Sequence, residues 1–272
     1  MKLTEEQAQR YSRHFVLKEV GVSGQKKLLS AKVLVIGAGA LGSSAIMYLA
    51  AAGVGTIGIC DYDVVDISNL QRQIIHRTSS VGKEKVVSAE HAVGELNPDV
   101  QVVLHRQRLT ADNIQGVIEN YDFILDCTDR FETKFLINDG CVLSKKPYCH
   151  AGVVRFGGQV MTYVPEQGPC LRCLLGNVPE DSLTCAEAGV LGAVTGVIGS
   201  IQALEAIKYL LGIGQLLVGK VLRFDGLNVH MGVTNFAHSD EGCAVCGVNP
   251  TIKSLAENRS DYEIKSCGCG GV

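Results

Sequence analysis

Short apolar runs alternate with longer amphipathic segments along the first half of the chain. The runs have the length and composition of buried strands, and the longer segments repeat their apolar residues at helical spacing. Because a helical segment separates many of these strands, we expect the strands to run parallel, in an α/β fold with a Rossmann-like, doubly wound, mostly parallel sheet. The expected strands are 32–36, 56–60, 100–105 and 123–127, and the expected helices are 43–52, 83–97 and 130–145.

The pattern is less regular in the second half of the chain and at its two ends. Thr4 and Gln7 have capping-box spacing, which predicts an N-terminal helix that carries Arg13, and the polar stretch 21–27 predicts a connection after it. Residues 251–272 are polar and then rich in Gly and Cys, so we expect one domain over 1–250 and a flexible tail over 251–272. Further strands are expected at 147–151, 159–164 and 221–225, and a helix at 198–211.

The composition narrows the class of protein. The 272 residues are 46% hydrophobic and 19% charged, as in a folded globule, and the net charge of −3 argues against nucleic acid as a partner. No uninterrupted apolar run approaches about 20 residues and the N-terminus lacks a signal-peptide core, so we expect no membrane association. The 11 cysteines are odd in number and scattered through expected strands, which favours reduced thiols and a cytoplasmic location.

Two Cys-x-x-Cys pairs stand far apart in the sequence, at Cys170 and Cys173 and at Cys243 and Cys246. Such pairs present four thiolates to a tetrahedral Zn²⁺. About 70 residues separate them, far more than the ~15–20 of a compact zinc ribbon, so a zinc ion here would join two distant segments. Redox-active thiols and simple packing are the alternatives.

A glycine loop follows the first expected strand. Gly37, Gly39 and Gly42 fit the G-x-G-x-x-G pattern, in which glycines let the backbone approach phosphates at the N-terminus of a helix. Asp61 ends the next expected strand about 20 residues later, where an acidic side chain would hold ribose hydroxyls. The pattern predicts a nucleotide site but does not choose between NAD and ATP.

A series of short polar motifs accompanies the glycine loop and the cysteine pairs. They are RYSR at 10–13, DYD at 61–63, SNLQRQ at 68–73, VGKEK at 81–85, DCTD at 126–129 and TCAEAG at 184–189. With these motifs in this order, residues 5–248 resemble the ThiF, MoeB and HesA family of ubiquitin-activating-like adenylyltransferases, which charge sulfur carrier proteins in molybdopterin and thiamine biosynthesis.

The resemblance implies a reaction and roles for matching residues. The C-terminal glycine carboxylate of a small ubiquitin-like carrier ending in Gly-Gly would attack the α-phosphorus of Mg·ATP, giving an acyl adenylate and pyrophosphate. Asp129 would hold Mg²⁺, and Arg13 would reach the phosphates of a neighbouring subunit, which implies a homodimer. The residues that would bind ATP are Gly37, Gly39, Gly42, Asp61, Asp63, Asn69, Arg72, Gln73 and Lys85.

The residue types suit this chemistry because a carboxylate and a triphosphate, both anions, must approach each other. Arg72 can donate two parallel hydrogen bonds to phosphate, Lys85 can act as a compact positive charge, and a carboxylate such as Asp129 suits hard Mg²⁺. Considered alone, Arg13, Arg72 and Lys85 would be solvated surface cations, and Asp129 would cap the helix that begins near residue 130.

Several questions remain open at this stage. Cys185 either links covalently to the carrier or is an unreactive loop thiol, and Cys267 and Cys269 either carry sulfur or lie in a disordered end. We expect the sulfur donor to be a separate sulfurtransferase or cysteine desulfurase. The alternative functions are an NAD(P)-binding oxidoreductase, a non-catalytic carrier-binding scaffold, and a ligase that activates another peptide or carrier on the same fold.

Overall fold

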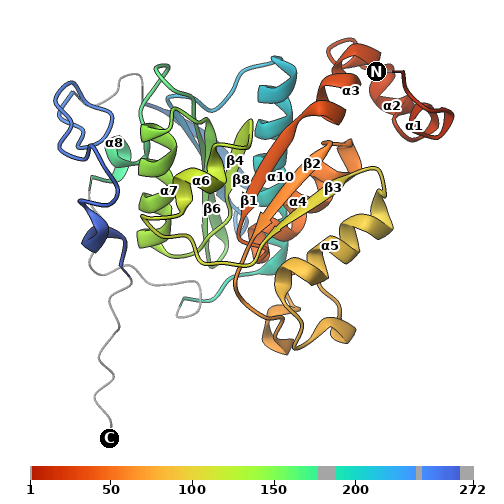
Figure 1. Cartoon of the computed structure of the whole chain (residues 1–272), viewed down its shortest axis with the longest axis horizontal. Coiled ribbons are helices and arrows are strands. Elements are labelled where there is room, and N and C mark those ends of the chain that lie inside the picture. The colour runs from red at the N-terminus through yellow and green to blue at the C-terminus, as the bar shows by residue number, and fades with distance from the viewer. Residues whose placement is uncertain (1, 177–187, 237–240, 264–272) are drawn as a thin grey trace, which may run out of the picture.

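The computed structural model describes residues 2–176, 188–236 and 241–263, and these residues build one eight-stranded sheet with helices on both faces (Figure 1). The strand order is β3-β2-β1-β4-β5-β6-β7-β8. The strands from β3 to β5 are parallel, and the strands from β6 to β8 are added antiparallel. Their bounds are β1 Lys32–Ile36, β2 Thr56–Cys60, β3 Gln101–His105, β4 Phe123–Asp126, β5 Tyr148–Val154, β6 Gly157–Tyr163, β7 Lys220–Asp225 and β8 His230–Asn235.

The doubly wound, mostly parallel sheet predicted from the sequence is confirmed. The α-helices are α1 Glu5–Arg10, α2 Ser12–Phe15, α3 Gly21–Ser30, α4 Ala40–Ala52, α5 Lys85–Leu96, α6 Ile114–Ile118, α7 Phe131–Leu143, α8 Leu171–Leu175 and α10 Gly192–Leu211. The 3₁₀ turns are η1 Ile67–Asn69, η2 Thr78–Ser80 and η3 Arg259–Tyr262.

Alternating side chains of each central strand enter two different cores. In β1, Val33 and Val35 join the core formed with α4, α5 and α10, whereas Leu34 and Ile36 join the core formed with α6 and α7. Both faces of a parallel sheet are covered in this way, and its strands therefore consist of continuous apolar runs. This is why the central strands were visible in the sequence.

Several elements differ from the sequence-based expectation, which did not include the short helices α6 and α8. The stretch 21–27, predicted to be a connection, belongs to helix α3, whose buried residues Gly24, Gln25 and Leu28 have helical spacing although only Leu28 is a large apolar residue. Strand β8 was missed because its six residues, all at least partly exposed, hold only two large apolar side chains, Met231 and Val233, and so give a weak strand pattern. Helix α10 begins at Gly192 rather than 198, because its first turns hold small residues of low helix propensity.

The N-terminal helices α1 to α3 are fixed to the end of the helical layer that lies away from the glycine loop (Figure 1). Arg10 donates to Leu96 O at 2.9 Å, Gln25 donates to Ala52 O at 2.9 Å and Lys27 donates to Leu211 O at 3.2 Å. These carbonyls end α5, α4 and α10, where helical C=O groups lack partners within the helix. Buried Tyr11 adds a hydrogen bond from Asn97 Nδ2 at 2.8 Å.

Part of the segment predicted to be a flexible tail is packed against the body of the protein. Ile252, Leu255 and Tyr262 are buried in the core beside α7, and Tyr262 donates to Asp139 Oδ2 at 2.7 Å. The prediction of a tail is therefore wrong up to Glu263, because three apolar side chains spaced along a polar segment gave too weak a pattern. Cys267 and Cys269 lie outside the described residues.

Helix α10 is the one helix among the described residues whose length and hydropathy would suffice to cross a membrane. Half of that apolar window is buried inside the protein, where α10 packs against α4 and the sheet. Buried Glu205 accepts from the Thr162 hydroxyl and the Leu217 amide. These contacts are those of a core helix.

Close contact between α4 and α10 depends on Gly199. A Cβ atom there would lie 2.3 Å from both Leu41 O and Ser44 Oγ, so the Gly199→Ala variant must separate the two helices. We predict that this substitution lowers the free energy of unfolding by about 1–3 kcal/mol, as overpacking does. Gly196→Ala, one turn earlier in open space, is the control and should raise stability by about 0.5–1 kcal/mol through helix propensity. Chemical denaturation measures both, and equal effects would contradict the packing argument.

Candidate functional site

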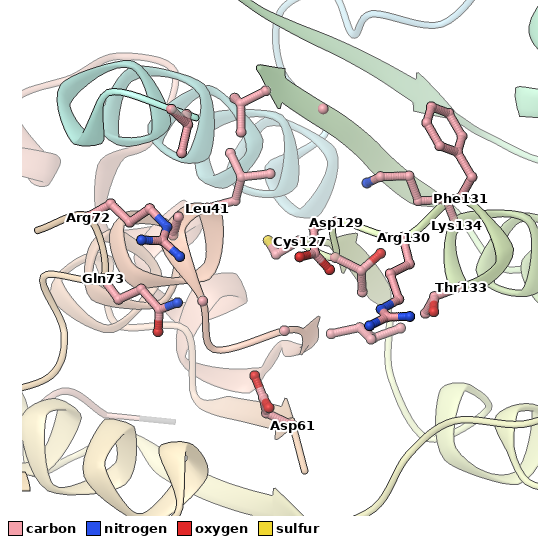
Figure 2. Close-up of a pocket in the computed structure, with 18 of the residues that line it drawn as sticks. Leu41, Asp61, Arg72, Gln73, Cys127, Asp129, Arg130, Phe131, Thr133 and Lys134 are labelled. Carbon is pink, nitrogen blue, oxygen red and sulfur yellow. The ribbon is translucent and has the colours of Figure 1, made fainter. Parts of the chain in front are cut away.

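A cavity of about 880 Å³ lies at the carboxyl ends of the parallel strands and continues to the antiparallel strands β5 to β7 (Figure 2). This edge is where doubly wound sheets bind ligands. Eight of the residues predicted from the sequence line it, namely Gly37, Gly39, Asp61, Asp63, Arg72, Gln73, Lys85 and Asp129.

The glycine loop has the geometry of a phosphate-binding turn. Gly37 has φ +100°, and a Cβ on it would lie 2.7 Å from Cys127 O. Gly42 does not line the cavity but permits the turn, since a Cβ there would lie 2.0 Å from Gly37 O. Gly39 precedes α4 without any side-chain cap, so the first N–H groups of the helix are available to an anion in the cavity.

Asp61 ties the glycine loop to the end of β2. Its Oδ2 accepts from the Ala38 amide at 2.8 Å and its Oδ1 accepts from the Asp63 amide at 2.9 Å. Each oxygen keeps a second lone pair, so the carboxylate can still accept from ribose hydroxyls. Buried His76, for which the sequence offered no partner, contacts Ala38 O and Ser88 Oγ, both at 2.9 Å, and burial lowers its pKa.

Lys85 brings a nearly buried ammonium group to the cavity. It is the first residue of α5, where the helix dipole disfavours positive charge, and it forms an ion pair with Asp63 Oδ2 at 2.9 Å. The Asp63 side chain is 51% exposed, so a phosphate group can compete with it for the lysine. Arg72 lies beside Gln73 at the cavity (Figure 2), and its Nη1 donates to Ser68 O at 3.0 Å.

Gln73 lines the cavity but is itself mostly buried. Its side chain lies beside the glycine loop, the residue is only 6% exposed, and its Oε1 is buried without a partner among the described residues. Leaving such an atom unsatisfied costs about 1–3 kcal/mol.

Asp129 is exposed in the cavity and forms no hydrogen bond or ion pair with any residue that the structure describes (Figure 2). It does not cap α7, because the N-cap residue is Arg130 and no side chain makes that capping bond. The interpretation of Asp129 as a helix cap is therefore wrong. Its carboxylate is available to a cation.

The turn that carries Asp129 is anchored by Asp126, which is fully buried at the end of β4. Asp126 Oδ1 accepts from the Thr128 amide at 3.1 Å and from its hydroxyl at 2.7 Å. Oδ2 accepts from His150 Nδ1 at 2.7 Å and lies 3.3 Å from Lys134 Nζ. Burial alone would raise the pKa of Asp126, but the Lys134 charge and the His150 and Thr128 hydrogen bonds hold it well below its usual range.

Besides Gly42, two predicted residues that the structure describes do not line the cavity. Asn69 uses its side chain to accept from the Asp66 amide at 3.2 Å. Arg13 is exposed on α2, in the N-terminal unit at the other edge of the sheet. Cys185 lies outside the described residues, so its role stays a prediction.

The cavity also contains arginines that the sequence analysis missed, Arg108, Arg130 and Arg223. Arg108 follows β3, and its guanidinium carbon lies 6.0 Å from the centre of the Tyr62 ring. Arg130 follows Asp129 directly, so a rule that searched the residues just after each parallel strand would have found it. Arg223 comes from an antiparallel strand, for which that rule gives no signal.

The two cysteine pairs meet as predicted. The Sγ atoms of Cys170, Cys173, Cys243 and Cys246 all lie within 4.8 Å of one another, and individual separations run from 3.3 to 3.9 Å. Zn–S bonds of about 2.3 Å in a tetrahedron require sulfur separations of about 3.8 Å, so small shifts of the four thiolates would let them hold a zinc ion.

A buried ion pair fixes the first cysteine segment to α7. Arg172, between Cys170 and Cys173, donates from Nε and Nη2 to the Asp139 carboxylate at 2.7–2.9 Å. Asn138 Oδ1 accepts from the Leu171 amide at 2.8 Å. The cluster therefore forms on a rigid support.

Comparisons with known proteins agree with this architecture. The model of the ThiF family matches residues 11–245. The protein called adenylyltransferase and sulfurtransferase MOCS3 from Culex quinquefasciatus is 45% identical over 264 residues, which cover 96% of this chain and 59% of the relative. The protein of the same name from Bos taurus is 43% identical over 268 residues, which cover 98% of this chain and 58% of the relative. The chain thus spans about three fifths of the length of these relatives.

A solved structure has the same fold. The crystal structure of E. coli MccB with ATP superposes with a TM-score of 0.77 at 24% identity, over 87% of this chain and 74% of that chain. At this identity the likeness concerns the fold alone.

We predict that the four clustered cysteines bind one Zn²⁺ per chain. Because closed thiolate coordination is structural, Cys173→Ser should lower the melting temperature and the zinc content together. Cys141→Ala is the control, since Cys141 is buried on α7 but lies outside the cluster, and it should lower stability without loss of zinc. Metal analysis of freshly purified, unchelated protein that finds no zinc would contradict the prediction.

Proposed function

The chain belongs to the ThiF family, and from that membership we propose that it adenylates the C-terminal glycine carboxylate of a small ubiquitin-like sulfur carrier protein. A carboxylate oxygen of the carrier forms a bond to the α-phosphorus of ATP. The bond from that phosphorus to the β-phosphate oxygen breaks, and pyrophosphate leaves with the electron pair. The observation that carries the proposal is that the glycine loop, two predicted cations and Asp129, which pairs with no described residue, meet in one cavity.

The nucleotide would lie across the parallel half of the cavity. Asp61 would accept from the ribose hydroxyls, and the N-terminus of α4 would face the phosphates. Gln73 would donate to the nucleotide from its side-chain nitrogen, which lies beside Gly39 of the glycine loop. These residues bind and orient ATP and do not change covalently.

The cations would lower the barrier to the attack of one anion on another. Negative charge moves onto the phosphate oxygens and the departing pyrophosphate, and fixed donors in a water-poor site stabilise it strongly. Arg72 can give a bidentate contact, and Lys85 can leave Asp63 for a phosphate oxygen. Asp129 would hold Mg²⁺, which supplies further neutralisation of the triphosphate when bound. No general base is needed, since the attacking carboxylate is already ionised near neutral pH.

The antiparallel half of the cavity suits the end of the carrier. Gly152 and Gly157 line it, and neither carries a side chain that would narrow this part of the cavity. Walls without side chains leave room for an extended glycine-rich tail, so its carboxylate can reach the phosphates. Both the molybdopterin-type and the thiamine-type carrier fit this description, and a panel of purified carriers decides between them.

We also propose a homodimer with shared sites. Arg13 is fixed at the amino-terminal edge of the sheet, whereas the cavity lies at the carboxyl edge, so Arg13 does not reach the cavity of its own chain. Its proposed role at the phosphates therefore requires a second copy of the chain. The N-terminal unit is rigidly attached, and this would allow it to present Arg13 in a defined direction.

The ATP chemistry is tested by pyrophosphate exchange in the presence of each carrier. We predict that Asp129→Ala and Arg72→Ala each lower the exchange rate by about 10²–10³, because each removes a group that stabilises charge in the transition state. Arg106→Ala is the control, since it removes an exposed cation paired with Glu84 outside the cavity. Near-normal exchange in both cavity variants would refute the assignment.

The shared site is tested by mixing two inactive proteins. Arg13→Ala and Asp129→Ala chains should each be nearly inactive alone. After subunit exchange, one site of each mixed dimer combines an intact Arg13 with an intact Asp129, so pyrophosphate exchange should reappear. Demonstrated subunit exchange without recovered activity would count against cross-subunit catalysis.

A further inference from the structure

We infer that Asp126, Lys134 and His150 are positioning residues that aim Asp129 at the metal. This inference rests on the proposed function, in which Asp129 holds Mg²⁺. None of the three is needed as a magnesium ligand itself. Asp126 has no exposed surface, and His150 does not line the cavity.

The turn between the end of β4 and Asp129 is held by hydrogen bonds to Asp126. Both polar hydrogens of Thr128, on the backbone nitrogen and on the hydroxyl, point to the same oxygen, Asp126 Oδ1, at 3.1 and 2.7 Å. A carboxylate that accepts from a residue two positions later forms an Asx turn, which fixes the path of the backbone. The next residue in this path is Asp129, whose own side chain is held by no described residue.

Asp126 is itself held by side chains from two other elements, β5 and α7. Its other oxygen, Oδ2, accepts from His150 on β5 at 2.7 Å, and Lys134 on α7 lies 3.3 Å away. Lys134 also donates to Ala151 O at 2.7 Å, so α7, β4 and β5 are joined through one carboxylate. One oxygen thus faces the protein interior and the other faces the turn that ends at Asp129.

The buried charge of Asp126 is compensated by Lys134. A fully buried carboxylate stays ionised only with compensation, which the Lys134 ammonium provides. Burial, followed by the Lys134 charge, lowers the pKa of His150, so that this imidazole is a neutral donor to Asp126. The ionised Asp126 accepts strongly from Thr128 and keeps the turn in one conformation.

The experiment compares matched pairs of variants. His150→Leu removes the donor to Asp126, whereas His150→Asn keeps a nitrogen donor near the position of Nδ1. Thr128→Val removes the hydroxyl, whereas Thr128→Ser keeps it. The measurement is the Mg²⁺ concentration that gives half-maximal ATP–pyrophosphate exchange, with the melting temperature recorded for every variant.

We expect His150→Leu and Thr128→Val to raise the required Mg²⁺ concentration about tenfold, as loss of a residue that orients a metal ligand does. The Asn and Ser variants should stay close to the parent protein. If His150→Leu does not fold, the Thr128 pair gives the same comparison at a partly exposed position. A loss of rate that is equal at all Mg²⁺ concentrations, or no change in Mg²⁺ dependence, would overturn the inference.

The Asp129→Ala variant separates this inference from the proposed function. A changed Mg²⁺ dependence for Asp129→Ala, with parental behaviour of His150→Leu and Thr128→Val, would leave the metal role intact and refute the positioning role. Parental Mg²⁺ dependence for Asp129→Ala would refute the metal role, and the positioning role with it. If no carrier supports exchange, the Mg²⁺ dependence of ATP binding, measured by calorimetry, provides the same comparison.

Discussion

The carboxylates of Asp126 and Asp139 have no exposed surface, so their charge has to be compensated inside the protein. Helix α7 takes part in both of the ion pairs that do this. It supplies Lys134 to Asp126 at the edge of the cavity, and it carries Asp139, which binds Arg172 of the cysteine segment. Removing one member of such a pair leaves an uncompensated charge and costs about 3–5 kcal/mol. One helix thus connects the nucleotide cavity with the cysteine cluster through buried ion pairs.

Because of this connection, the cysteine cluster lies where two distant segments of the chain meet α7. Tyr262 adds a third contact to Asp139, so the segment after the second cysteine pair and the segment of the first pair meet on the same carboxylate. A zinc ion would join the same two segments a second time, through sulfur. A bound metal and the ion pair would therefore hold the same two segments together, on the opposite face of the sheet from α4 and α10.

The central part of the fold could be predicted because its signals are local. The parallel strands are continuous apolar runs, and the glycine loop and Cys-x-x-Cys pairs have fixed spacing. Helix α3 and strand β8 were missed because neither buries a regular set of apolar residues. The Asp126, Lys134 and His150 cluster was missed because its members come from three elements and share no spacing. Gln73 was expected at the site, but its unpartnered oxygen is visible only in the folded protein.

The attachment of the N-terminal helices has an electrostatic consequence along the sheet. Parallel helices in one layer all point their positive ends to the same edge, and here that edge is the cavity. Their negative ends gather at the other edge, where Arg10 and Lys27 bind the last carbonyls of α5 and α10. The N-terminal helices α1 to α3 therefore place positive side chains against the negative ends of the helices in this layer. The positive helix ends lie at one edge of the sheet and the negative ends at the other.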